Sequence, residues 1–189
     1  LKKQQRDDES MLAGILNTGD TVLMVIPIDS AAPKGRLILP QVQALRDCLD
    51  NGIRAILVTP ELLEKTLCDI TDINLVITDS QIFDYVAQCV PMEIPLTSFS
   101  MLLANQKGGI RQLIEGTKVI SSLEDGDNIL MLEACTHSAT HEDIGKVKIP
   151  TLLKKVTGKE LVFTHMSGYD FPESIEKYKL VIQCGGCMI

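Results

Sequence analysis

The last apolar segment of the chain ends in a pair of cysteines. The sequence closes with VIQCGGCMI (residues 181–189), in which two glycines separate Cys184 from Cys187. A C-x-x-C spacing serves dithiol redox chemistry, or it supplies two thiolates to a metal ion or an iron–sulfur cluster. The first question is whether residues elsewhere in the chain complete a site with these two thiols.

A third cysteine stands in a similar place, after another apolar run. Cys135 lies in EACTHSATHED (residues 133–143). Three thiolates are too few for a closed tetrahedral zinc site or a fully cysteine-ligated cluster, both of which need four ligands. A histidine or carboxylate is a harder and more exchangeable ligand than a thiolate. The same segment offers His137, His141, Glu142 and Asp143.

The two glycines of the C-x-x-C also have a predicted role. Gly185 and Gly186 lack side chains, so the backbone can turn tightly and bring amide N–H groups close to cluster sulfur, where hydrogen bonds tune the potential. A thioredoxin-like pair instead opens a helix after a strand, and this sequence ends before such a helix. A dithiol redox protein and a structural zinc module stay open as alternatives.

The remaining cysteines and one histidine receive structural interpretations. Cys48, Cys68 and Cys89 fall in predicted helices and are interpreted as small buried hydrophobic residues. His165 ends a predicted strand and is interpreted as a surface residue. None of these four is expected to bind metal.

The elements that must position the three cysteines alternate between strand and helix patterns. Apolar, β-branched runs predict strands at 21–28, 53–60, 73–79, 92–96, 128–134, 160–165 and 179–183. Helical spacing and end signals predict helices at 39–52, 60–69, 80–90, 149–158 and 171–178, with Ser80 as the cap of the third. A connecting helical region at 97–128 is interrupted at Gly108-Gly109. Short helices between strands predict βαβ crossovers and parallel sheets.

The predicted fold class is therefore α/β, with two tandem parallel-sheet, Rossmann-like domains. Residues 1–19 are expected to be a linker or N-terminal extension, 20–97 the first domain and 98–189 the second. Neighbouring parallel strands deliver their C-terminal loops to one edge of the sheet. If the strands before Cys135 and Cys184 are neighbours, three thiols meet there.

Composition excludes several classes of function. Hydrophobic residues make up 45% of the 189 residues, which is ample for a packed core. A net charge of -7 with scattered lysines argues against a nucleic-acid partner. No apolar run approaches the roughly 20 residues that span a bilayer, and the charged N-terminus lacks the apolar core of a signal peptide. We expect a cytoplasmic protein with no membrane partner and no disulfide framework.

Several of these stretches resemble one protein family. C-T-H at 135–137, followed about fifty residues later by C-G-G-C-M at 184–188, resembles the cluster-binding domain of the [FeFe]-hydrogenase maturation GTPases, the HydF family. PKGRLILPQVQ (33–43), within 20–52, resembles the dimerisation domain of that family. The resemblance covers residues 20–188.

The resemblance implies a function for the chain. Family members carry a GTP-binding domain, a dimerisation domain and a [4Fe-4S] domain. It implies a homodimeric scaffold or carrier that holds a [4Fe-4S] cluster, receives a transient di-iron precursor and delivers it to apo-[FeFe]-hydrogenase, alongside radical-SAM maturases. No G-x-x-x-x-G-K-[ST] phosphate loop occurs in the 189 residues, so GTP would bind a domain outside them. We expect a fragment without catalytic activity of its own.

The family pattern also assigns ligands, with one departure. Cys135, Cys184 and Cys187 carry over as cluster ligands. The family usually has a histidine immediately before C-x-x-C, whereas this chain has Gln183, a poor iron ligand. We expect the fourth position to be filled from the loop after Cys135. The candidates in order are Glu142, His137 and His141, with Glu142 alternatively a helix-start acid that favours the helix dipole.

Overall fold

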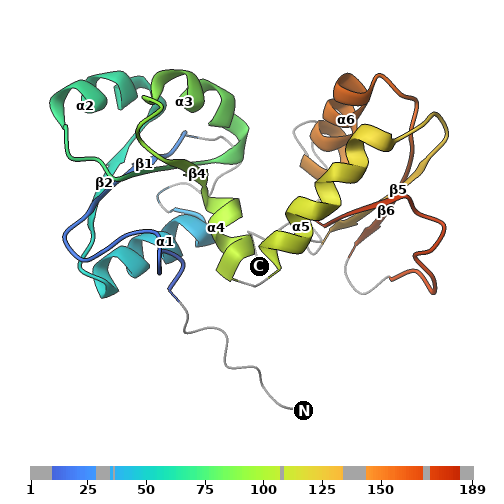
Figure 1. Cartoon of the computed structure of the whole chain (residues 1–189), viewed down its shortest axis with the longest axis horizontal. Helices are drawn as coiled ribbons and strands as arrows, with labels where there is room; N and C mark the ends of the chain where they lie inside the picture. The colour runs from blue at the N-terminus through green and yellow to red at the C-terminus, as the bar shows by residue number, and fades with distance from the viewer. Residues whose placement is uncertain are drawn as a thin grey trace, which may run out of the picture. The chain divides into compact units, whose positions relative to one another are not determined.

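The computed structural model describes residues 10–28, 35, 37–106, 109–133, 144–167 and 171–183. The chain divides into two compact units, Leu1–Gly108 and Gly109–Ile189, and each unit has a parallel sheet of its own (Figure 1). Among the described helices, none is long and apolar enough to cross a membrane.

The first unit is built on a four-stranded parallel sheet. Its strands are β1 (Thr21–Val25), β2 (Arg54–Val58), β3 (Leu75–Thr78) and β4 (Leu96–Ser98), in the order β2-β1-β3-β4. Every residue of β1 is buried, as is every residue of β3. Such continuous apolar runs are typical of central strands whose two faces are both covered.

Helices cover both faces of this sheet. The helices are α1 (Leu39–Asp50), α2 (Leu63–Asp69, after the 3-10 turn η1 at Pro60–Leu62), α3 (Phe83–Cys89, after η2 at Ser80–Ile82) and α4 (Phe99–Gln106). Core residues of α1 and α4 pack on one face, and those of α2 and α3 on the other (Figure 1). Met11 and Leu12 are buried in the α1–α4 core, so the chain before Asp20 contributes to this unit.

The ends of α1 follow the signals in its sequence. Pro40 stands in the first turn, Asn51 is the C-cap, and Gly52 has a φ of 65°. That left-handed conformation suits glycine because it has no Cβ. The prediction that Ser80 caps the third helix is wrong, because its hydroxyl lies 2.7 Å from Ser100 Oγ instead.

The second unit is a smaller parallel sheet. After α5 (Ile110–Thr117) and the 3-10 turn η3 (Lys118–Ser122) come β5 (Asn128–Glu133), the π-helical turn η4 (Ile144–Lys148), α6 (Ile149–Thr157), β6 (Val162–Ser167) and β7 (Leu180–Gln183). The strand order is β6-β5-β7, all parallel. Ile129 and Met131 of β5 pack with residues of η3 and α6 on one face. The predicted α/β fold with two parallel sheets is confirmed.

One predicted helix of this unit does not form. Residues 171–178 contain no helix and only a turn closed by the Tyr178 N–H, which donates to the Ile175 carbonyl at 3.0 Å. The side chain of Tyr178 is buried, and the next N–H, of Lys179, donates to the Asn128 carbonyl at 2.9 Å. This anchoring to β5 prevails over the weak helical pattern of a short segment.

Candidate metal centre

The two strands that precede the predicted thiolate ligands are neighbours. β5 and β7 form a parallel ladder in which Ile129 pairs with Leu180 and Leu132 pairs with Gln183. β5 ends at Glu133 and β7 ends at Gln183. The segments that carry Cys135 and Cys184 therefore begin at adjacent points on the carboxyl edge of one sheet.

The predicted site residues themselves lie outside the described part of the chain. They are Cys135, His137, His141, Glu142, Cys184, Gly185, Gly186 and Cys187. Within the described ranges, no group of three or more His, Cys, Asp and Glu side chains could hold a metal ion. The ligand set remains a prediction. The described residues show only where the segments that carry the ligands leave the sheet.

A buried carboxylate stands at this edge, and the sequence interpretation did not single it out. Glu133, the last residue of β5, is only 8% exposed. Lys146 Nζ lies 3.8 Å from its Oε2, whereas Oε1 has no hydrogen-bond partner among the described residues. The one available signal was its place in NILMLE: with Ile129 and Met131 it falls on the face of the strand that faces the core.

Gly145 makes room for this carboxylate. A Cβ built on Gly145 would overlap Glu133 Oε1 and would lie 3.1 Å from Cδ and 3.3 Å from Cγ. Gly145 belongs to the π-helical turn η4. Isolated π-helical turns are rare and occur frequently at functional sites. The end of β5 and the turn after the Cys135 segment are thus in direct contact.

The cysteines of the first unit are not arranged as ligands. Cys48 is buried in α1, and burial raises the pKa of its thiol to about 11, so it stays protonated. Cys68 in α2 is exposed, which corrects the prediction that it is buried. Cys89 in α3 is half-buried, with its Sγ 3.8 Å from Glu64 Oε1. All three lie in helices, as predicted.

Polar residues at the carboxyl edge of the first sheet are already hydrogen-bonded to one another. The buried Gln41 donates from Nε2 to Asp79 Oδ2 at 3.0 Å and accepts at Oε1 from the Ile38 N–H at 3.1 Å. Ser98 Oγ lies 2.9 Å from Ser100 Oγ. Such satisfied networks stabilise the loops that they join, whereas Glu133 Oε1 has no hydrogen-bond partner among the described residues.

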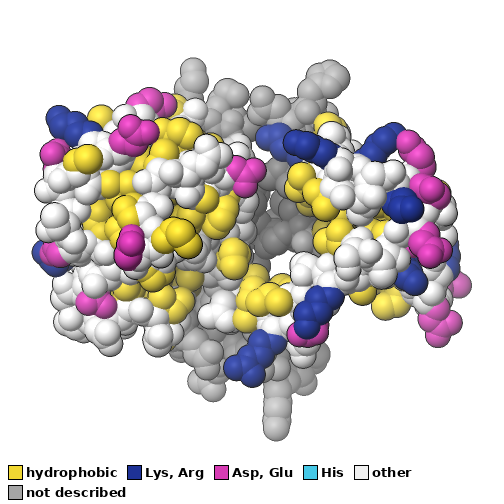
Figure 2. All heavy atoms as spheres, turned by 45° about the horizontal axis from the view of Figure 1, so that its top comes forward, with side chains coloured by type: hydrophobic (Ala, Val, Ile, Leu, Met, Phe, Trp, Pro, Cys, Tyr) yellow, Lys and Arg dark blue, Asp and Glu magenta, His cyan; other side chains and the backbone are white. Residues whose placement is uncertain are grey.

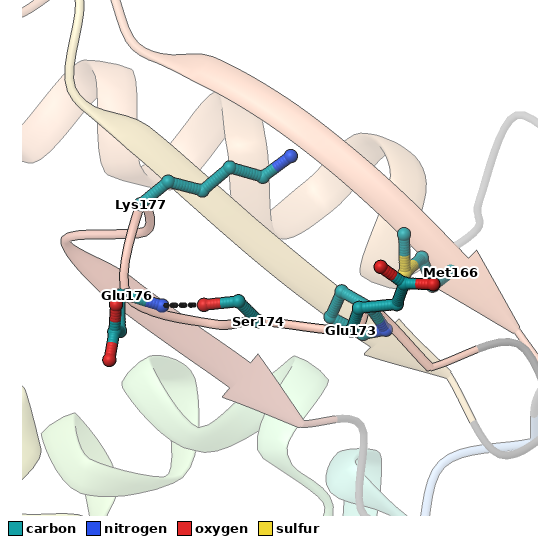
Figure 3. Close-up of a pocket in the computed structure, with 6 residues that line it drawn as sticks. Met166, Glu173, Ser174, Glu176 and Lys177 are labelled. Atoms are coloured by element: carbon teal, nitrogen blue, oxygen red, sulfur yellow. Dashed lines mark hydrogen bonds between the residues drawn. The ribbon is translucent and has the colours of Figure 1, made fainter.

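An open pocket of about 540 Å³ lies beside the second sheet. It is lined by Met166, Pro172, Glu173, Ser174, Glu176 and Lys177 (Figure 3). Ser174 Oγ accepts a hydrogen bond from the Glu176 N–H at 3.3 Å, and His165 on β6 is exposed and stacks on Phe163. Met166 lies on β6, where it pairs with Leu132 of β5, and β6 and β7 flank β5 on opposite sides. Among the described residues that line the pocket there is no cysteine or histidine.

Comparison with known families gives two matches that together span most of the chain. The profile of the hydrogen maturase F dimerization domain matches residues 11–108, and that of the hydrogen maturase F tetramerization domain matches residues 111–189. No individually curated protein matches the sequence.

Solved structures give only distant likenesses. A structure of fatty acyl-adenylate ligases from E. coli and L. pneumophila matches with 14% identity and a TM-score of 0.39, over 82% of this chain and 33% of that one. O-succinylbenzoate coenzyme A synthetase from Bacillus subtilis, in complex with AMP, matches with 12% identity and a TM-score of 0.38, over 95% and 58%. The chain spans about a third of the first and little over half of the second, and neither likeness carries a functional argument.

Proposed function

Because this chain belongs to the hydrogen maturase F family and so has a role in hydrogenase maturation, we propose that it is the scaffold that carries the metal cargo. It holds a [4Fe-4S] cluster with one exchangeable position on the edge of its second sheet. It receives a di-iron precursor and passes it to apo-[FeFe]-hydrogenase in cooperation with radical-SAM maturases. The cluster supplies an iron whose fourth ligand can be replaced by the incoming precursor.

The adjacency of β5 and β7 carries this proposal. Adjacent strands lie about 4.8 Å apart, and consecutive Cα atoms are about 3.8 Å apart. Cys184 follows Gln183 directly, Cys135 follows Glu133 by two residues, and Gln183 pairs with Leu132. Covalent geometry therefore keeps the Cα atoms of the two cysteines within about 20 Å of each other, a range that includes the separations at which both thiolates bind one cubane cluster. Cys187 follows three residues after Cys184.

The chemistry of the available donors fits a site-differentiated cluster. Cys135, Cys184 and Cys187 supply three thiolates, which leaves one iron for a weaker ligand. Glu142 is our first candidate for that ligand, His137 the second and His141 the third. Gly185 and Gly186 leave amide N–H groups free to approach cluster sulfur. In the alternative proposals, Cys184 and Cys187 form a redox pair or the thiolates bind zinc.

Anaerobic reconstitution with iron and sulfide tests the proposal directly. The full 189-residue chain should take up about four irons and give the EPR signal of a reduced cubane. Stoichiometric zinc without iron uptake would support the structural-zinc alternative instead. A reversible two-electron dithiol couple without bound iron would support the redox alternative.

Glu142→Ala tests the fourth ligand. We expect iron content close to wild type, because three thiolates remain, and an altered EPR spectrum or faster binding of an exogenous ligand such as imidazole. His137→Ala is the matched comparison and should leave the spectrum unchanged. The reverse pattern would reassign the fourth position to His137, and two unchanged spectra would exclude both residues.

The family descriptions also indicate self-association, for which the first unit offers an unpaired strand edge. Among the described strands, β2 is an outer strand of the first sheet. The Arg54 N–H donates to Asp20 and the Val58 carbonyl accepts from Ile26, at 2.8 and 2.9 Å. Because alternate residues of a parallel strand face the same neighbour, Ala55 and Leu57 direct their backbone groups to the free edge. We propose that two copies pair along this edge.

Leu57→Pro should weaken this dimer without breaking the sheet. Proline removes an N–H that β1 does not use, and proline is tolerated on edge strands. Sedimentation analysis should show a dissociation constant raised at least about tenfold. Leu57→Ala is the control, because it shortens a side chain that is 43% exposed but keeps the N–H. Equal dissociation constants for the two variants would place the dimer contact elsewhere, for example on the exposed hydrophobic side chains drawn in yellow in Figure 2.

A further inference from the structure

The unpaired oxygen of Glu133 needs an explanation. Glu133 is only 8% exposed, and burying a carboxylate oxygen that has no hydrogen-bond partner, as Oε1 has none among the described residues, costs free energy. The other residues on this face of β5, Ile129 and Met131, are apolar and fully buried, so the face does not otherwise use charged residues. The position of Glu133 at the strand end therefore points to a local purpose.

The contacts of Glu133 join two points that flank the predicted ligand segment. Its carboxylate contacts Gly145, which lies twelve positions further along the chain. Its Oε2 also forms an ion pair with Lys146 Nζ, at 3.8 Å. Between these points the sequence carries Cys135 and Glu142. Holding the ends of a segment together reduces the number of conformations open to everything between them.

The register of the sheet relates the same carboxylate to the second cysteine segment. Leu132 is paired with Gln183, so Glu133 is the next residue of β5 and Cys184 is the next residue after β7. Glu133 is therefore the strand residue from which the Cys135 segment leaves the sheet, and it lies next to the point from which the Cys184 segment leaves. A side chain in this position can set the spacing of the two segments.

We propose that Glu133 is a positioning residue. It clasps η4 to the end of β5 through Gly145 and Lys146, and it thereby fixes where Cys135 and the fourth ligand stand relative to Cys184. The effect on the cluster rests on the proposed function, whereas the clasp itself is a property of the chain without iron. Gly145 is the necessary partner, because any Cβ there would displace the carboxylate.

Two variants break the clasp from opposite sides. Glu133→Gln keeps the shape of the side chain but removes the charge that faces Lys146, and Gly145→Ala places a methyl group where Oε1 lies. The matched controls lie in the same unit. Gly116→Ala adds a methyl group that meets nothing within 4 Å, and Glu160→Gln removes a carboxylate that is exposed and paired with Lys154.

Hydrogen exchange of the iron-free chain tests the clasp. Amides of Ile144–Lys148 should exchange about tenfold faster in both clasp variants than in either control, because their turn loses its anchor. Unchanged exchange in both clasp variants would overturn the proposal.

The reconstituted chain tests the positioning role. Glu133→Gln and Gly145→Ala should bind iron but shift the EPR g values and the midpoint potential, which a purely structural clasp would leave unmoved. Faster exchange with an unaltered cluster would overturn the positioning role. If the wild-type chain binds no cluster, the proposed function fails, and the exchange experiment alone decides whether Glu133 is a clasp.

Discussion

Cys135→Ser is expected to abolish the cluster while leaving both sheets folded. The cluster loses one of its three thiolate ligands when Cys135 is replaced, and a serine oxygen is a much poorer ligand for iron. Iron uptake after anaerobic reconstitution should fall from about four irons per chain to well below one. Circular dichroism should stay close to wild type, because Cys135 lies beyond the last residue of β5.

Cys68→Ser is the matched control for this experiment. Cys68 is an exposed thiol on α2 in the first unit, so its replacement removes one cysteine from the chain without touching the second sheet. Its iron content should equal that of wild type. The variants also separate the alternatives, because a redox pair of Cys184 and Cys187 should survive Cys135→Ser. Full iron uptake by Cys135→Ser would contradict the three-thiolate site.

Much of the fold could be predicted because its strands carry strong local signals. TVLMV in β1 and NILMLE in β5 are apolar runs of strand length, and each proved to be a central strand with two parallel neighbours. Asn51 and Gly52 ended α1 as expected, since the left-handed φ of Gly52 is a local property of that residue. Features that depend only on neighbouring residues, such as apolar strand runs and a glycine at a helix end, can be predicted from a single sequence.

The errors lie where tertiary contacts decide the outcome. The segment 171–178 has helical composition, but its end is anchored by the burial of Tyr178 and the pairing of Lys179 with Asn128. Ser80 has the residue type of a helix cap, but Ser100 lies within hydrogen-bond reach. Neither partner is near in sequence, so neither could be read from a local pattern.

Only the part of the candidate site that depends on local sequence patterns could be predicted. Three cysteines after two strand patterns led to the expectation of one shared edge, and the pairing of β5 with β7 supports that expectation. Glu133 gave only a faint signal, because a glutamate after an apolar run is usually the first exposed residue of a loop. Its contact with Gly145 joins residues on either side of the Cys135 segment and appears only in three dimensions.

Met131→Ala is expected to remove the cluster without altering any ligand, by unfolding the second unit. Met131 is fully buried on the central strand β5, where it pairs with His165 on β6 and Ile182 on β7. Truncation of a buried methionine to alanine costs about 2–5 kcal/mol. That is comparable to the whole stability of a small domain, which is on the order of 5 kcal/mol.

Chemical denaturation of the iron-free chain would measure this effect, with Met92→Ala as the control because Met92 is 100% exposed. The transition of the second unit should move to much lower denaturant or disappear, while that of the first unit stays in place, since the two units have separate cores. Iron uptake should fall together with this transition, unlike in Cys135→Ser, where uptake falls and the transition stays. If Met131→Ala changes neither the unfolding transition of the second unit nor its iron uptake, the packing of Met131 is not required for the cluster site.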